Sequence, residues 1–191
     1  LAALDGAKHV VMCFASPKLV TSLVTTHLPL FRVPRAVTRV SVARSILALS
    51  ELLSARSRRV PRIAVASLNP HAGEGELLGS EERTAIVPGI RIAARSLGKR
   101  AQVSGPLGAE TAYRKALAGD FDGVVAMYHD QATIPLKLLS FGTAVNVTMG
   151  LGITRTSVDH GTGYDIAWQR KADASGMLAA MKLAKRLASA R

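Results

Sequence analysis

The sequence lacks the features that mark secreted, disulfide-stabilised or membrane-spanning proteins. It contains one cysteine, Cys13, among 191 residues, so no intramolecular disulfide can form. No apolar run approaches the roughly 18 residues that a transmembrane helix needs. The first ten residues include Asp5, Lys8 and His9 where a signal peptide would have an apolar core. We therefore expect a cytoplasmic protein without a membrane partner, in which Cys13 is an inert core thiol.

Aromatic residues are also scarce, at 4% of the chain, whereas the formal net charge is +12. Much of this charge comes from eight arginines: Arg32, Arg35, Arg39, Arg44, Arg56, Arg58, Arg59 and Arg62. Such a cluster is compatible with a solvated helix face or with a basic nucleic-acid-binding domain. Surfaces that bind single-stranded nucleic acid usually add stacking aromatic side chains. Their scarcity here disfavours a nucleic-acid partner.

The sequence contains no internal repeat, low-complexity tract or obvious linker, so residues 1–191 are predicted to form a single α/β unit. Short β-branched runs alternate with segments of helical period, which indicates a mainly parallel or mixed sheet flanked by helices. The predicted strands cover residues 9–14, 19–26, 62–67, 101–103, 123–127 and 144–148. The predicted helices cover residues 38–58, 80–97, 109–118, 131–139 and 175–188.

Two helices allow more detailed predictions. Ser80 is expected to cap the helix at 80–97, and Gly98 to end it. In the last helix, Met177, Met181, Ala184 and Leu187 are expected to face inward.

Three histidines each follow an apolar run: His27, His71 and His129. The ends of strands converge in an α/β sheet, so distant side chains can meet there. Neutral imidazoles suit zinc or a similar divalent cation, and three protein ligands leave one position open for substrate. Taken singly, each histidine is more often structural than a ligand, and no two lie within helical reach of each other.

Four segments resemble the signature segments of the 4-hydroxythreonine-4-phosphate dehydrogenase family: residues 25–30 (TTHLPL), 69–75 (NPHAGEG), 127–131 (MYHDQ) and 155–162 (RTSVDHGT). The similarity covers essentially the whole chain and corresponds to the C-terminal two-thirds of a family member. It implies a fold like that of isocitrate and isopropylmalate dehydrogenases. It also implies oxidation of a phosphorylated hydroxy amino acid, with decarboxylation, in pyridoxal phosphate (vitamin B6) biosynthesis.

The resemblance implies that His27, His71 and His129 bind one divalent metal, zinc, with magnesium and cobalt as alternatives. The family shares its metal ligands across a dimer interface, so a homodimer is expected. Lys137, Asn146 and Arg155 match the substrate-binding residues of the family. Their chemistry suits a carboxylate and a phosphate, because lysine offers a point charge and arginine a planar pair of donors.

The dinucleotide site rests on weaker signals, because no Gly-x-Gly-x-x-Gly follows a predicted strand. Residues 159–167 resemble the cofactor loop of isocitrate and isopropylmalate dehydrogenases. This resemblance assigns His160, Gly161 and Asp165 to NAD or NADP, and a glycine-rich connection before a helix is the alternative. Glu110 stands where the family has aspartate and is a candidate active-site acid.

Two further departures leave the substrate open. Residues 76–79 read ELLG where the family usually has GHMG, and residues 168–170 replace a glycine-containing turn. A paralogue acting on phosphothreonate or phosphoerythronate is therefore an alternative. Family members also extend about a third of their length before the position of Leu1. We accordingly expect a truncated chain with weak or absent catalysis, and an inactive interaction fragment stays open.

Overall fold

The computed structural model describes residues 1–190 and contains one mixed sheet of seven strands in the order β4-β3-β5-β2-β1-β6-β7. The strands are β1 (Val11–Ala15), β2 (Val20–Leu23), β3 (Arg62–Ala66), β4 (Gln102–Leu107), β5 (Gly123–Ala126), β6 (Val145–Met149) and β7 (Arg155–Val158). β4, β3, β5 and β2 run parallel, whereas β2–β1, β1–β6 and β6–β7 are antiparallel pairs. This is the mixed α/β sheet that the sequence predicts.

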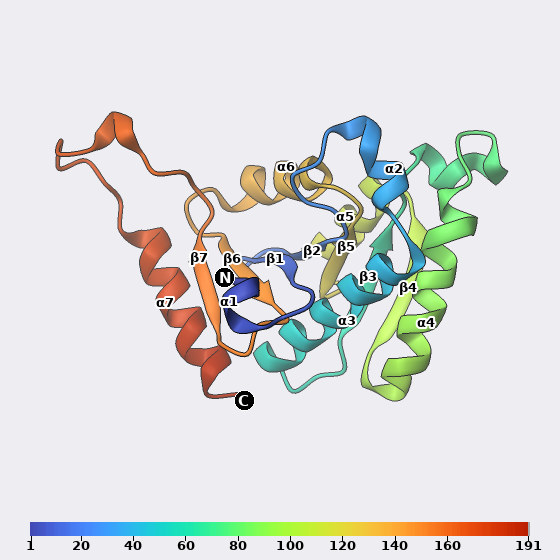
Figure 1. Ribbon diagram of the computed structural model, residues 1–191, viewed down its shortest axis with the longest axis horizontal. Helices are drawn as coiled ribbons and strands as arrows, with labels where there is room; N and C mark the ends of the chain where they lie inside the picture. Colours follow the sequence, from blue (N-terminus) through green and yellow to red (C-terminus); the bar gives the residue numbers. More distant parts are fainter. Residues whose placement is uncertain (191) are drawn as a thin grey trace.

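Helices cover both faces of this sheet. They are α1 (Ala2–Asp5), α2 (Val33–Ala36), α3 (Arg39–Arg56), α4 (Val87–Leu97), α5 (Ala109–Leu117), α6 (His129–Ser140) and α7 (Ser175–Ala188). Buried residues of α3, α4 and α7 form one core with one face of the strands, and residues of α5 and α6 form a second core with the other face. Figure 1 shows α4 and α7 at opposite ends of the sheet, with α3 between them.

Helix α3 shows how local sequence and packing agree. Thr38 begins it with a capping box, in which its hydroxyl accepts the backbone N–H of Ser41 and the Ser41 hydroxyl accepts that of Thr38. The stripe that contains Val42, Ile46 and Leu49 is fully buried against the strands. Cys13 lies in the same core, and burial raises the pKa of its thiol well above the usual range. The predictions for this helix and for the core position of Cys13 are confirmed.

The prediction for the buried face of α7 is correct for Leu187 but wrong for the two methionines. Met177 and Met181 are more than half exposed, and the buried residues are Gly176, Ala180 and Leu187. Small residues let the helix lie close to β7, where the Thr156 hydroxyl donates to the carbonyl of Ala180. Apolar periodicity alone does not distinguish two neighbouring stripes of α7. The close approach of the α7 backbone to β7 decides which stripe is buried.

Several other boundaries also differ from the prediction. The helix at 80–97 opens with a π-helical turn at Glu82–Ile86, and no side-chain cap from Ser80 is present, although Gly98 ends it with a positive φ as expected. β4 extends beyond residue 103 to Leu107, and α6 begins at His129 instead of residue 131. β7 was not predicted, because its four residues show no alternation of apolar and polar side chains.

The arginines that cluster in the sequence are separated in space. Arg32 and Arg35 precede α3, whereas Arg58 and Arg59 follow it. Eighteen helical residues span about 27 Å, so the two groups lie at opposite ends of the helix. Arg62 is paired with Asp122 at 3.0 Å. Within residues 1–190, no helix combines the length and apolarity needed to cross a membrane.

Candidate functional site

His27 and His129 meet at the carboxyl-terminal edge of the parallel strands. β2 pairs in parallel with β5, and Thr25 extends this pairing by donating its N–H and its hydroxyl to the carbonyl of Met127. His27 and His129 each follow this pairing by two residues. Their ring centroids are 5.5 Å apart.

The geometry of this imidazole pair suits a shared divalent cation. With metal–nitrogen distances of about 2.0–2.1 Å and tetrahedral angles, two ligating rings have centroids about 5 Å apart. Nδ1 of His129 lies 2.7 Å from Oδ1 of Asp130, so Nε2 remains for a ligand. Carboxylates commonly orient metal-binding histidines in this way. The centroid distance of 5.5 Å is thus close to that of two imidazole ligands in a tetrahedral site.

His71 lies in a different setting, the short helical segment η2 (Pro70–Glu76). Residues 71–75 all have positive φ, between 44° and 86°. This left-handed conformation costs roughly 1–2 kcal/mol for each residue other than glycine. The His71 side chain is 76% exposed, and its Nδ1 is 3.9 Å from Oε2 of Glu74. Strained backbone of this kind persists where the surrounding structure holds it, often at functional sites.

One chain does not assemble the three predicted metal ligands. Across residues 1–190, no group of three His, Cys, Asp or Glu side chains lies close enough to hold a metal ion. The fold therefore brings His27 and His129 together and leaves His71 apart. The ligand assignment itself stays a prediction.

Two of the predicted substrate-binding residues share one face of the β6–β7 pair. Asn146 is opposite Ser157, and Thr148 is opposite Arg155, whose guanidinium donates to the Thr148 hydroxyl at 2.7 Å. Oδ1 of Asn146 is buried without a hydrogen-bond partner in the part of the chain that the structure describes. Lys137 is exposed on α6. A buried acceptor without a partner, beside an arginine, suits a polar ligand.

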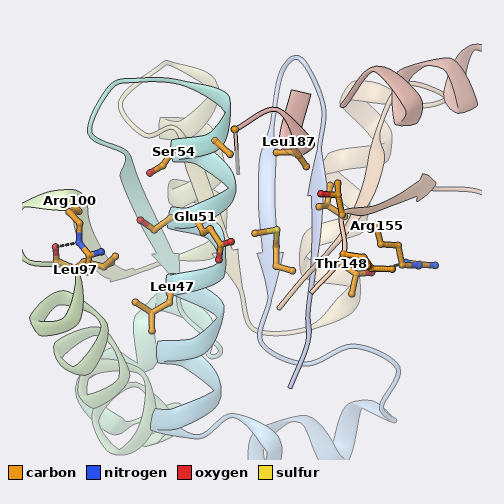
Figure 2. A pocket seen from close by; sticks show the side chains of 15 residues that line it. Leu47, Glu51, Ser54, Leu97, Arg100, Thr148, Arg155 and Leu187 are labelled. Atoms are coloured by element: carbon orange, nitrogen blue, oxygen red, sulfur yellow. Dashed lines mark hydrogen bonds between the residues drawn. The ribbon is translucent and has the colours of Figure 1, made fainter. Parts of the chain in front are cut away.

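A cavity of about 560 Å³ lies on the opposite face of these strands. Leu47, Glu51 and Ser54 of α3 line it, together with α7, as Figure 2 shows. Thr148 and Arg155 contribute to its wall, but in Figure 2 their side chains point away from α3. The cavity is consequently not the site that the histidines and Asn146 define.

The predicted cofactor residues and Glu110 lie on the surface. His160, Gly161 and Asp165 are exposed in the segment between β7 and α7, which reaches away from the body of the molecule in Figure 1. Nδ1 of His160 is 2.8 Å from the carbonyl oxygen of Gly161. Glu110 accepts a hydrogen bond of 3.1 Å from Arg114 in the first turns of α5. The fold brings neither group to the imidazole pair, and both assignments stay predictions.

Sequence reasoning did not single out three residues that organise the histidines: Asp130, Glu82 and Gln131. Gln131 accepts the N–H of Met127 and donates to the carbonyl of Ser67, so it joins the ends of β5 and β3. Asp130 and Gln131 belong to the segment MYHDQ, and that motif was the available signal. Glu82 carries no such signal, because its burial depends on the folded loop.

Comparison with known proteins places the chain in a family. Residues 1–184 match the family model described as "Pyridoxal phosphate biosynthetic protein PdxA". The chain belongs to this family. A 4-hydroxythreonine-4-phosphate dehydrogenase from Geobacter metallireducens is 50% identical over 188 residues, which cover 98% of this chain and 55% of that protein.

Solved structures agree with this PdxA membership. The crystal structure of 4-hydroxythreonine-4-phosphate dehydrogenase from Klebsiella pneumoniae superimposes with a TM-score of 0.86 at 40% identity, covering 98% of this chain and 56% of that one. A terephthalate 1,2-cis-dihydrodiol dehydrogenase from Burkholderia xenovorans gives a TM-score of 0.74 at 31% identity, covering 93% of this chain and 55% of that one. The chain spans about half the length of the curated relatives it matches.

Proposed function

We propose that this chain is part of a metal-dependent, NAD-linked dehydrogenase that oxidises 4-phosphooxy-L-threonine in vitamin B6 biosynthesis. The names of relatives at 44–50% identity support the reaction. The observation that carries the proposal is the pair of imidazoles 5.5 Å apart at the ends of β2 and β5. Zinc is the cation that this donor set favours, with magnesium and cobalt as alternatives.

The donors that the chain presents suit this reaction. His27 and His129 would hold the cation, and a bound cation would supply Lewis-acid polarisation of the substrate hydroxyl. Arg155 and Lys137 neutralise the phosphate and carboxylate, and Asn146 offers its buried amide oxygen to a substrate donor. NAD, when bound, would accept the hydride from the carbon that bears the secondary hydroxyl, and the hydroxyl proton would be released. The resulting β-keto acid loses carbon dioxide and leaves an amino-ketone phosphate.

The third ligand, His71, is assigned to a second copy of the chain. A complete site within one chain would need three donors close together, and residues 1–190 contain no such group. A twofold dimer places the same loop of each subunit at the other's site. The strained, exposed loop of His71 suits a ligand that reaches outward.

A zinc titration by calorimetry tests the ligand set. His27→Ala, His71→Ala and His129→Ala should each weaken zinc binding at least a hundredfold. The matched control is His9→Ala, which removes an exposed histidine outside the motifs and should bind as the unaltered chain does. Unchanged affinity in any of the three ligand variants would remove that residue from the site.

Mixing two defective variants tests whether the site is shared. A dimer of His71→Ala with His129→Ala contains one site with all three ligands and one site that lacks two of them. After random subunit exchange, about a quarter of the original tight sites should return. If both ligands came from the same subunit, mixing would restore none.

A second candidate is oxidation of a different hydroxylated substrate by the same site. The related structure named as a dihydrodiol dehydrogenase shows that this fold accommodates another oxidation. The ELLG segment at 76–79 and Glu110 depart from the family pattern. Comparing NADH formation with 4-phosphooxy-L-threonine, 4-phosphoerythronate and a cis-diol, with the complete enzyme, distinguishes the two candidates.

A further inference from the structure

Glu82 is a buried acid that the proposed reaction does not use. It is 6% exposed and lies in the first turn of the π-helical segment Glu82–Ile86. It has no Lys, Arg or His partner within 4.0 Å among residues 1–190. Burying a carboxylate is costly unless hydrogen bonds replace its water. Its position therefore requires strong compensating donors nearby.

Those donors come from the chain that leads into the His71 loop. Oε1 of Glu82 accepts the backbone N–H groups of Leu68 and Asn69 at 2.9 and 2.8 Å. Oε2 accepts Nδ2 of Asn69 at 2.9 Å. Hydrogen bonds to a charged group are roughly twice as strong as those between neutral groups. The carboxylate thus fixes the two residues that immediately precede Pro70 and His71.

The loop also closes over this carboxylate. A Cβ placed on Gly73 would lie 3.0 Å from Oε2 of Glu82 and 3.1 Å from the carbonyl of Gly79. Gly73 is buried, whereas its neighbours Glu74 and Gly75 are exposed. Glu82 therefore contacts both the entry and the middle of the left-handed segment that carries His71.

A chain of hydrogen bonds continues from this anchor to the other histidines. The Ser67 hydroxyl donates to the carbonyl of Asn69 at 2.8 Å, and the Ser67 carbonyl accepts from Gln131. Gln131 also accepts the N–H of Met127, two residues before His129. The entry to the His71 loop is accordingly tied to the strand end that holds the imidazole pair.

We propose that Glu82 is a positioning residue, which holds the left-handed His71 loop in its metal-binding shape before any metal or partner arrives. The metal role of His71 rests on the proposed function, whereas the effect on the loop does not. Without Glu82, the strained residues 71–75 would relax toward ordinary conformations, and His71 would need to be ordered when metal binds. Disturbing outer partners of metal ligands typically lowers metal affinity 10–100-fold.

Amide hydrogen exchange on the full chain without metal tests the anchoring directly. In Glu82→Gln, one acceptor becomes a donor facing Nδ2 of Asn69, so exchange at Leu68 and Asn69 should accelerate at least tenfold. Exchange at Val124 in the core should not change. Gly73→Ala should also accelerate exchange at Leu68 and Asn69, because its methyl group would press against Oε2 of Glu82. Glu51→Gln removes an exposed carboxylate on α3 and is the matched control.

Each outcome has a defined meaning. Unchanged exchange at Leu68 and Asn69 in Glu82→Gln, or acceleration that spreads equally to Val124, would overturn the positioning role. Zinc titration of the same variants adds the functional readout, with a loss of at least tenfold in affinity expected for Glu82→Gln and none for Glu51→Gln. If the unaltered chain binds no zinc, the proposed metal site fails, yet the exchange result still decides the role of Glu82.

Discussion

The parallel strands and the β6–β7 pair present their candidate functional residues differently. β2 and β5 are buried along their whole length, and their histidines come only after the strands have ended. β6 alternates instead, with Val145, Val147 and Met149 buried and Asn146 and Thr148 half-buried. A strand that is covered on both faces can present functional side chains only at its ends. A strand with one open face can present them along its length.

The largest expected effect is on stability in the parallel region. Ile63 is fully buried in β3 between β4 and β5, so Ile63→Ala should lower the free energy of unfolding by about 2–5 kcal/mol. Thr148→Ala, on the open face of β6, should lower it by less than about 1 kcal/mol. Urea denaturation measures both. Equal losses would contradict the distinction between the two regions.

A middle-sized effect is expected at the strand ends. Asp130 holds Nδ1 of His129 at 2.7 Å, so Asp130→Asn should weaken zinc binding about tenfold while stability hardly changes. Calorimetric titration provides the affinity, and thermal unfolding of the metal-free chain is the control. Equal zinc affinity in Asp130→Asn would show that the carboxylate does not orient the ring.

Replacing Asn146, on the open face of β6, should affect stability differently from replacing a core residue. Its buried Oδ1 has no partner among the described residues, and leaving such a group unsatisfied costs about 1–3 kcal/mol. Asn146→Leu should therefore leave the free energy of unfolding unchanged or raise it by about 1 kcal/mol, while it abolishes substrate binding. A clear loss of stability in urea would mean that Asn146 serves the fold.

The smallest effect is expected at the opposite edge of the parallel strands. Partial burial of Asp122 would raise its pKa, but hydrogen bonds from the Arg62 side chain and backbone outweigh this and hold the pKa below its usual value. The resulting stabilisation is present above the unfolded-state pKa and is lost as pH falls through the folded-state pKa. Asp122→Asn should cost at most about 1 kcal/mol at pH 7 and nothing at strongly acidic pH. A pH series of urea melts measures this difference, and a cost that persists at strongly acidic pH would contradict the assignment.

Local pattern was sufficient where one physical requirement dominated. The apolar stripe of α3 predicted that helix to within two residues at its end, and the capping box at Thr38 favours the same helix. The pattern predicted the bounds of α7, but it was insufficient for the buried face of that helix and for β7. The polar residues of β7 become a strand only because β6 offers an edge, and α7 buries small residues because close approach to β7 excludes methionine.

The sequence by itself determined the fold class, most element positions and the four motifs that carry His27, His71, His129 and Arg155. Each of these depends on residues close together in the chain. Only the tertiary structure decided that Thr25 and Met127, 102 positions apart, pair so that His27 meets His129. It also decided that His71 stays apart on a loop anchored by Glu82. The first arrangement depends on the order of the strands in the sheet. The second depends on which hydrogen-bond donors surround the buried Glu82 carboxylate. Neither is encoded in a local sequence pattern.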